Sequence, residues 1–335
     1  MTTYVGVDVH SSQSTIAIIT SGQPKPSIIT VRGGPEEVKK QLLRIEAPFD
    51  LCFEASCGYG KWFETLSSVA RSVTVAHPGH LRLIYASKRK NDRVDASKLA
   101  KLLSVGAVPA VYVPNVQVRE WRGLIRHRGR TVAKCTAVKN SIRALLREQA
   151  IKAPRGLWTK KGILWLTQLD LPETTRWRMD EHLEDLELLK QRVSRFTRQL
   201  DQIAARHPGV ALLRTIPGVG TRTAEAFVAW VDDARRFART SQIGDYFGLV
   251  PRQDASARRN HLGHITKDGP GCVRQLLVEA AWQGIRRNGV IRAKYEQFRR
   301  GDKERTKKAI VATAHWLARV MLSMLRSGEV WRQAE

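Results

Sequence analysis

The sequence predicts an α/β domain at its amino-terminal end, followed by a mainly α-helical remainder. Before about residue 80, short runs of apolar and β-branched residues alternate with polar ones, which is typical of strands. After Pro114, apolar residues recur at spacings of three and four, which is typical of helices. The chain has 335 residues, of which 42% are hydrophobic, so it can bury cores in two domains and does not fit a disordered or low-complexity class.

The amino-terminal domain is expected to contain five strands. In the first, Tyr4 to Val9, three valines face one side while Gly6, Asp8 and His10 face the other. Short polar breaks separate this strand from the next two and indicate antiparallel hairpins. Helices then alternate with strands, and this element order is that of an RNase H-like fold. The later elements are strands over 14–20 and 27–31, a helix over 35–45, a strand over 50–54, a helix over 59–69 and a strand over 73–76.

The stretch after Pro114 predicts one long basic helix or a pair of helices. Residues 81–171 include 20 basic and 5 acidic side chains, and the apolar positions from Val118 to Leu146 follow a helical period. Cations on the other faces can follow the phosphates of a nucleic acid, and a solvated helix face is the simpler alternative. The candidate contacts are Arg126, Arg130 and Lys139.

Residues 172–207 show a heptad pattern sustained over four repeats. Two structures fit this pattern. A coiled coil between subunits would make the protein an oligomer, whereas a single helix could instead pack on its own domain. The a positions are Met179, Leu186, Val193 and Leu200, and the d positions are His182, Leu189, Phe196 and Ile203.

The charge is large and unevenly distributed. With 57 basic and 31 acidic residues the net charge is +26. Residues 1–80 and 172–207 each carry seven of both signs, whereas 81–171 is strongly basic and 208–335 carries 23 basic and 12 acidic residues. Such segregation predicts that the two basic segments bind a nucleic acid, with an affinity that falls as salt rises.

Four carboxylates in the first hundred residues are candidate metal ligands: Asp8, Glu54, Asp92 and Asp95. Asp8 interrupts an otherwise apolar strand, where a carboxylate is costly without a partner or a metal. Brought together, four carboxylates would repel one another unless cations neutralise them, and hard oxygen ligands suit Mg²⁺ or Mn²⁺. Taken singly, each acid is also compatible with a turn or a helix N-cap. The adjoining cations Lys88, Arg89 and Lys90 would bring nucleic-acid phosphate to the site.

The second half contains two further candidate sites. Leu213 to Ala224 predicts a helix-hairpin-helix, in which the turn glycines Gly218 and Gly220 let backbone amides approach a phosphate. Residues 247–269 are expected to form a long polar loop with one serine, Ser256. Its hydroxyl could attack a phosphodiester, although a lone loop serine is usually only a surface hydroxyl. The surrounding cations are Arg252, Arg258, Arg259 and Lys267.

The cell compartment is expected to be the cytoplasm, with the protein associated with the nucleoid. The four cysteines are too scattered for a disulfide framework or a zinc site. The acid at Asp8 is where an export signal would be apolar, so none is expected. The segment from Ala309 to Leu325 contains His315 and Arg319, which favours an amphipathic helix over a membrane span.

Several of these segments together resemble the DEDD transposases of insertion sequences, described as bridge-RNA-guided recombinases. The amino-terminal strings Gly6 to His10, Phe53 to Ser56 and Lys90 to Ala96 are similar to the family's RuvC-like half. The hairpin at Ile216 to Gly220 and the stretch from Gly248 to Ala281 are similar to its carboxy-terminal domain. The chain departs from the family pattern in having alanine on both sides of Ser256 and Pro270 where asparagine is usual.

The resemblance implies a transposase that cuts and rejoins DNA. It implies that the four carboxylates bind Mg²⁺ or Mn²⁺, that Ser256 is a nucleophile forming a phosphoserine intermediate, and that the partners are DNA, a guide RNA and further copies of the chain, as a dimer or tetramer. The expected domains are a RuvC-like domain over 1–112, basic helices with a coiled-coil connector over 113–207 and a helix-hairpin-helix and serine domain over 208–335. The alternatives are a RuvC-type Holliday-junction endonuclease, a non-catalytic nucleic-acid-binding protein and, least favoured, an actin-like ATPase.

Overall fold

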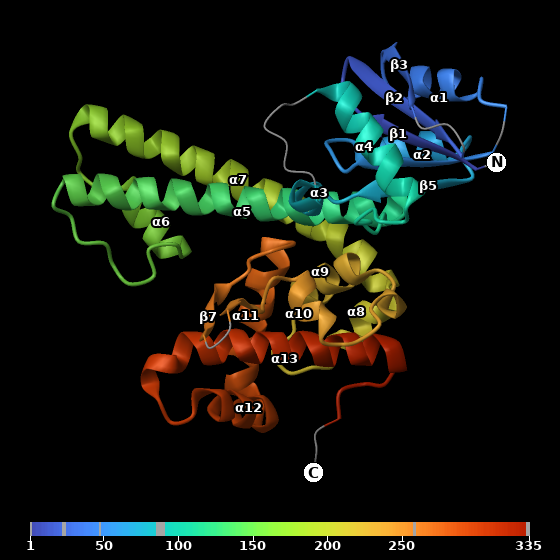
Figure 1. Ribbon diagram of the computed structural model, residues 1–335. Helices are drawn as coiled ribbons and strands as arrows, with labels where there is room; N and C mark the ends of the chain where they lie inside the picture. The colour runs from blue at the N-terminus through green and yellow to red at the C-terminus, as the bar shows by residue number, and fades with distance from the viewer. Residues whose placement is uncertain (1, 22–24, 47, 85–90, 257–258, 333–335) are drawn as a thin grey trace. The chain divides into compact units, whose positions relative to one another are not determined.

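The computed structural model describes residues 2–21, 25–46, 48–84, 91–256 and 259–332 (Figure 1). The chain divides into two compact units, Met1–Arg119 and Glu120–Glu335. Within the described ranges, no helix combines the length and the apolar character that crossing a membrane requires.

The first unit is built on a mixed sheet of five strands in the order β3-β2-β1-β4-β5. The three strands of the meander pair antiparallel, and β1, β4 and β5 run parallel to one another. This is the RNase H-like arrangement that the alternating apolar runs predict, and the predicted strands are confirmed. The strands are β1 (Thr3–Asp8), β2 (Gln13–Thr20), β3 (Ser27–Arg32), β4 (Phe49–Glu54) and β5 (Ser72–Ala76).

Helices cover both faces of this sheet. On one face, the buried side chains of Val5, Val7 and Phe53 pack with α1 (Pro35–Leu42) and α2 (Tyr59–Ser67). The opposite face is covered by α4 (Asp92–Ser104), which packs on β1, β2 and β4 through small residues (Figure 1). The short helix α3 spans Pro78–Ile84. The sheet is therefore the middle layer of three, as burial on both sides of the central strands requires.

Gly6 sets the distance between α4 and the sheet. It lies on β1, on the face that α4 covers, and a Cβ atom added there would overlap Ala96 O and Ala100 N of the α4 backbone. A backbone atom cannot rotate away as a side chain can, so any side chain at this position would push α4 outward. Because Asp92 and Asp95 stand in the first turn of α4, Gly6 also fixes their height above the strand ends.

We therefore expect Gly6→Ala to lower the free energy of unfolding by about 1 to 3 kcal/mol, the usual cost of overpacking. Urea denaturation of the full chain measures this. Gly129→Ala is the matched control, because Gly129 lies within a helix and its added methyl meets no atom within 4 Å. That variant should be more stable by about 0.5 to 1 kcal/mol. An unfolding midpoint of Gly6→Ala equal to that of the parent would contradict this close packing.

The second unit is mainly helical, as predicted, and includes one β-hairpin. Its helices are α5 (Val116–Glu148, which begins just before the boundary), α6 (Lys160–Thr167), α7 (Glu173–Arg206), α8 (Pro208–Leu213), α9 (Thr221–Val231), α10 (Gln242–Tyr246), α11 (Gly271–Arg287), α12 (Gly289–Arg299) and α13 (Thr306–Ser327), with short 3-10 turns at Ala234–Arg236 and Lys303–Arg305. Helices α8 to α13 share a large apolar core, to which α5 and α7 contribute one end.

The heptad of α7 is buried against α5 of the same chain. Arg128 of α5 donates to Thr197 of α7 (2.8 Å), and Glu148 accepts from Arg178 (3.2 Å), so the two helices run antiparallel. The a positions Met179, Leu186 and Leu200 are at most 1% exposed and pack with α5 or the core at its end. The interpretation as a helix packing on its own domain therefore accounts for the apolar seam.

The hairpin differs from the sequence-based expectation. The sequence predicts a loop over 247–269, whereas Pro251–Ser256 (β6) and Arg259–Ile265 (β7) pair antiparallel with a register shift near Gln253. The stretch lacks the apolar alternation that marks a half-buried strand, because its strands form a two-stranded ladder of their own. Backbone pairing, which sequence patterns of side chains do not report, shapes this segment.

Arginines cap the carboxy-terminal end of α9. Arg122 of α5, which is 6% exposed, donates to Ala229 O (2.7 Å) and Trp230 O (3.0 Å). Arg236 donates to Val231 O (2.9 Å) and Trp230 O (3.1 Å). The last carbonyls of a helix have no partner within it, so these guanidinium groups satisfy them and join α5 to α9.

Candidate functional site

Two of the predicted carboxylates stand at the carboxyl ends of neighbouring parallel strands. Asp8 is the last residue of β1 and Glu54 the last of β4. Each lies one residue beyond the paired Val7 and Phe53, so both fall on the sheet face that carries Gly6. The strand register thus places them next to each other along one edge of the sheet.

The other two carboxylates stand in the first turn of α4. The helix begins after Asn91, whose side chain accepts a hydrogen bond from Arg93 N (3.0 Å) as an N-cap. Asp92 and Asp95 are the acids of the first turn, where the helix dipole favours negative charge. Asp95 also accepts a hydrogen bond from Lys98 Nζ (3.2 Å). Helix capping and the helix dipole are by themselves a structural reason for acids at these positions. They do not explain why Asp92 also lies close to Asp8 and His10.

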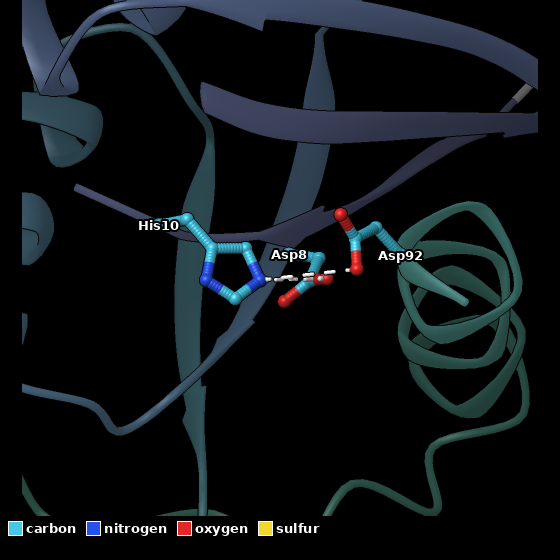
Figure 2. Close-up of side chains that lie close together, drawn as sticks. All are labelled: Asp8, His10 and Asp92. Carbon is cyan, nitrogen blue, oxygen red and sulfur yellow. Dashed lines mark ion pairs between the residues drawn. The ribbon is translucent and has the colours of Figure 1, made fainter. Parts of the chain in front are cut away.

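Asp8, His10 and Asp92 converge at this edge of the sheet (Figure 2). His10 Nε2 lies 3.4 Å from Asp8 Oδ2 and 4.0 Å from Asp92 Oδ1. One ligand atom from each of the three lies within 4.8 Å of the others, a spacing that a single metal ion can bridge. Among the described side chains, Glu54 and Asp95 do not join this group, although they flank it.

The electrostatics of Asp8 fit a cation site. Burial raises the pKa of the Asp8 carboxyl, His10 opposes that rise, and the carboxylates of Asp92 and Asp95 add to it. The Asp8 side chain is 19% exposed, compared with 52% for Asp92. A negative charge that is poorly solvated and surrounded by like charges is stabilised by a bound cation. Carboxylate oxygens suit Mg²⁺ and Mn²⁺, and an imidazole nitrogen suits the softer of these ions better.

Sequence reasoning missed His10 as a member of this site. Its signal was present, because alternation along the first strand places His10 on the same side as Asp8. A metal site predicted here from carboxylates alone therefore leaves out the imidazole nitrogen that lies beside Asp8 and Asp92.

Of the nucleic-acid contacts predicted on the basic helix, two lie against tryptophan rings and the third is exposed to solvent. The guanidinium of Arg126 lies 5.2 Å from the ring centre of Trp230, and the Lys139 ammonium lies 5.2 Å from that of Trp158. Such cation–π contacts hold a side chain in place and leave its charge able to attract an anion. Arg130 is exposed. The predicted contacts Lys88, Arg89, Lys90 and Arg258 lie outside the described residues.

The two glycines of the predicted helix-hairpin-helix, between α8 and α9, differ in their surroundings. Gly218 has a positive φ of 96°, and a Cβ atom there would overlap the backbone of Gly284 and Ala280 on α11. Gly220 precedes α9 and has no atom within 4 Å of an added Cβ. Packing on α11 explains Gly218, whereas the open side of Gly220 leaves room for a phosphate to approach the α9 amides.

The hairpin that carries Ser256 is held at its base. Arg274 of α11 donates from Nη1 to Phe247 O (2.8 Å) and Asp268 O (2.7 Å), the two backbone positions that flank β6 and β7. Gly248, with φ of 61°, lies close to the Asp268 backbone. Ser256 is the last residue of β6, and Arg259 the first of β7, although their side chains lie outside what the structure describes. Arg252 and Lys267 are exposed.

Comparison with known proteins decides the family. The family model described as "Transposase IS116/IS110/IS902 family" matches residues 210–296. A second model, a transposase model of the DEDD type, matches residues 5–150 and so includes Asp8, Glu54, Asp92 and Asp95. The chain belongs to this transposase family. The transposase is thus a DEDD enzyme of insertion sequences that cuts DNA, and the predicted family and class of enzyme are confirmed.

Curated transposases are similar in sequence to this transposase along most of its chain. It is 30% identical to the transposase for insertion sequence element IS1111A of Coxiella burnetii, over 68% of this chain and 64% of the relative. It is 28% identical to the putative transposase y4qE of Sinorhizobium fredii, over 83% of this chain and 71% of the relative. It is 24% identical to the transposase for insertion sequence element IS1328 of Yersinia enterocolitica, over 87% of this chain and 88% of the relative.

Proposed function

We propose that this transposase cuts and rejoins DNA with a divalent cation held by Asp8, Glu54, Asp92 and Asp95 and with Ser256 as the nucleophile. The observation that carries the proposal is the convergence of Asp8 and Asp92 with His10, at the edge where Glu54 ends its own strand. A partly buried carboxylate with a raised pKa beside two more carboxylates has no evident structural use.

The chain's own residues fit an oxygen-binding divalent cation. Asp8 and Asp92 provide oxygens close together, Glu54 and Asp95 flank them, and His10 provides a nitrogen. Mg²⁺ or Mn²⁺ bound there would polarise a phosphodiester and stabilise the charge that develops on it during attack. The rigid strand ends and the Gly6-limited height of α4 hold the ligands before the substrate arrives, which lowers the cost of ordering them.

The serine step needs a hydroxyl and nearby positive charge. Ser256 Oγ forms a bond to phosphorus while the bond from phosphorus to a deoxyribose oxygen breaks, and that oxygen takes up a proton in place of the one lost from Oγ. Arg252, Arg258, Arg259 and Lys267 would stabilise the added charge on the phosphate. Arg274 supports the step indirectly, since it fixes both ends of the hairpin.

The same proposal assigns partners and domains. DNA is the substrate of a transposase, and we further propose a guide RNA on the basic helices around Arg126, Arg130 and Lys139. We also propose domains over 1–112, 113–207 and 208–335, and assembly as a dimer or tetramer. Because the a positions of the heptad are buried within the chain, such an assembly would use other faces of α5 and α7.

Removal of the cation tests this function. We expect strand cleavage of DNA containing the element ends to fall to the background rate in buffer with EDTA, because the clustered carboxylates then lack their counter-charge. Adding Mg²⁺ or Mn²⁺ in excess should restore cleavage, as measured by product release on a denaturing gel. Cleavage at the full rate in EDTA would contradict the proposal.

A further inference from the structure

We propose a phosphate-binding site in the carboxy-terminal unit where α12 meets α13, separate from the candidate active site. A cavity of about 350 Å³ lies there, lined by Gln297, Phe298, Arg300, Arg305, Lys308 and Ala312. The matched family segments end at residue 296, before the first lining residue. The ligand is the phosphodiester backbone of a nucleic acid, a choice that rests on the proposed function.

The charge of the cavity points to an anion. Three of its six lining side chains are cations and none is a carboxylate. In the described part of the chain, none of the three takes part in an ion pair. Of the three acids in residues 286–308, Glu296 pairs with Arg299 (3.2 Å), Asp302 accepts from Glu304 N (2.8 Å), and none lines the cavity. Cations that line one cavity without an ion-pair partner repel one another, and a phosphate bound between them would offset that repulsion.

Two donors in the cavity favour an oxygen-rich ligand. The Nε of Arg305 is buried and has no hydrogen-bond partner among the described residues. Gln297 Oε1 accepts from Lys294 Nζ (2.8 Å), which leaves the Gln297 amide N–H groups to donate. A buried donor without an acceptor is costly, and a phosphate oxygen is an acceptor that an arginine binds well.

The backbone at Arg300 gives a second reason. Arg300 ends α12 in the left-handed region, with φ of 54° and ψ of 37°. Glycine or asparagine is the usual residue at such a position, because other side chains are disfavoured there. The sequence places a cation in this costly conformation, with glycine only at the next residue, Gly301. Residues kept in disfavoured conformations cluster at binding sites, and Arg300 lines the cavity.

The surrounding segment suits a polyanion more than a small anion. Residues 286–308 contain ten basic and three acidic side chains. The first turn of α13, which begins beside the cavity, contains no acid, so its amides add to the positive field. A nucleic-acid backbone can contact the cavity and these neighbouring cations together, which a single phosphate ion cannot do.

The test measures binding of the full chain to two fluorescein-labelled probes of arbitrary sequence, a DNA duplex and a single-stranded RNA, by anisotropy. EDTA is present throughout, so the binding measured does not depend on cleavage. A negative result would therefore contradict the phosphate site without contradicting the proposed catalysis. The triple variant Arg300→Gly/Arg305→Gln/Lys308→Gln should bind at least one probe about tenfold more weakly. The slope of log K against log salt should decrease by about one for each phosphate that the variant no longer neutralises.

The control is a second triple variant, Arg195→Gln/Arg198→Gln/Arg319→Gln. It removes the same amount of charge from three exposed cations on α7 and α13, away from the cavity. Arg300→Gly alone should bind about threefold more weakly and melt no lower than the parent, since glycine suits its backbone. Weaker binding of DNA, of RNA or of both, beyond that of the control, supports the site and identifies its polymer. Unchanged binding of both probes, or a loss equal to the control's, overturns it.

Discussion

Replacing Asp8 by asparagine is expected to slow DNA strand cleavage by a factor on the order of 10³ or more. The change keeps the shape of the side chain and removes the least exposed negative charge of the group that includes Asp92 and His10. A divalent cation then loses a ligand that the strand holds rigidly. A cleavage assay in Mg²⁺ measures the rate.

The stability of Asp8→Asn should change in the opposite direction from its activity. Burial raises the pKa of Asp8 above its value in the unfolded chain, so without metal the ionised form destabilises the native state at neutral pH, and this cost disappears as the pH falls below the unfolded pKa. Asparagine removes the cost. In metal-free urea denaturation at neutral pH, the variant should therefore be as stable as the parent or more stable.

Asp50→Asn is the control, because Asp50 lies near the start of β4, the strand next to that of Asp8, and pairs with Arg71. This variant should cleave DNA at the parent rate and lose little stability, since its ion pair with Arg71 is at the surface, where such pairs contribute weakly. Parent-like cleavage by Asp8→Asn would favour the non-catalytic interpretation of the carboxylates.

Ser256→Ala is expected to abolish strand exchange, with a loss on the order of 10³-fold or more, while DNA affinity is retained. The methyl side chain cannot form the bond to phosphorus, and a covalent protein–DNA adduct should disappear from denaturing gels. Ser323→Ala, an exposed serine on α13, is the matched control and should leave both exchange and adduct intact.

Full strand exchange by Ser256→Ala would refute the covalent mechanism and favour attack by water. The enzyme would then act as a RuvC-type nuclease, which needs the carboxylates alone. Combining this result with that of Asp8→Asn separates the two halves of the proposal, since each variant removes one chemical group.

Sequence patterns predicted the sheet well because its side chains alternate. Val5 and Val7 face a core while Gly6 and Asp8 face α4, and this period of two can be read directly from the order of the residues. The hairpin over 251–265 escaped prediction because its sequence lacks an apolar alternation and its two strands pair only with each other. The partner of the α7 heptad could not be read from the sequence, since an apolar seam has the same pattern whether its partner belongs to the same chain or to another.

For the candidate site, the sequence predicted which residues matter better than how they meet. Alternation and spacing singled out Asp8 and Asp92, which the fold brings together with His10. The close approach of α4 to the sheet depends on Gly6. Nothing in the sequence distinguishes this glycine from the others. Similarly, Arg274 is one basic residue among many until its two carbonyl partners are known.

The arginines that cap α9 affect how mutational surveys of this transposase must be interpreted. An alanine scan across its many basic residues measures two quantities at once. At the exposed Arg130, a reduced affinity would measure the attraction between that side chain and the polymer. At Arg122, alanine removes the guanidinium donor to Ala229 O and one of the donors to Trp230 O inside the protein, and the same reduction would measure how few molecules remain folded.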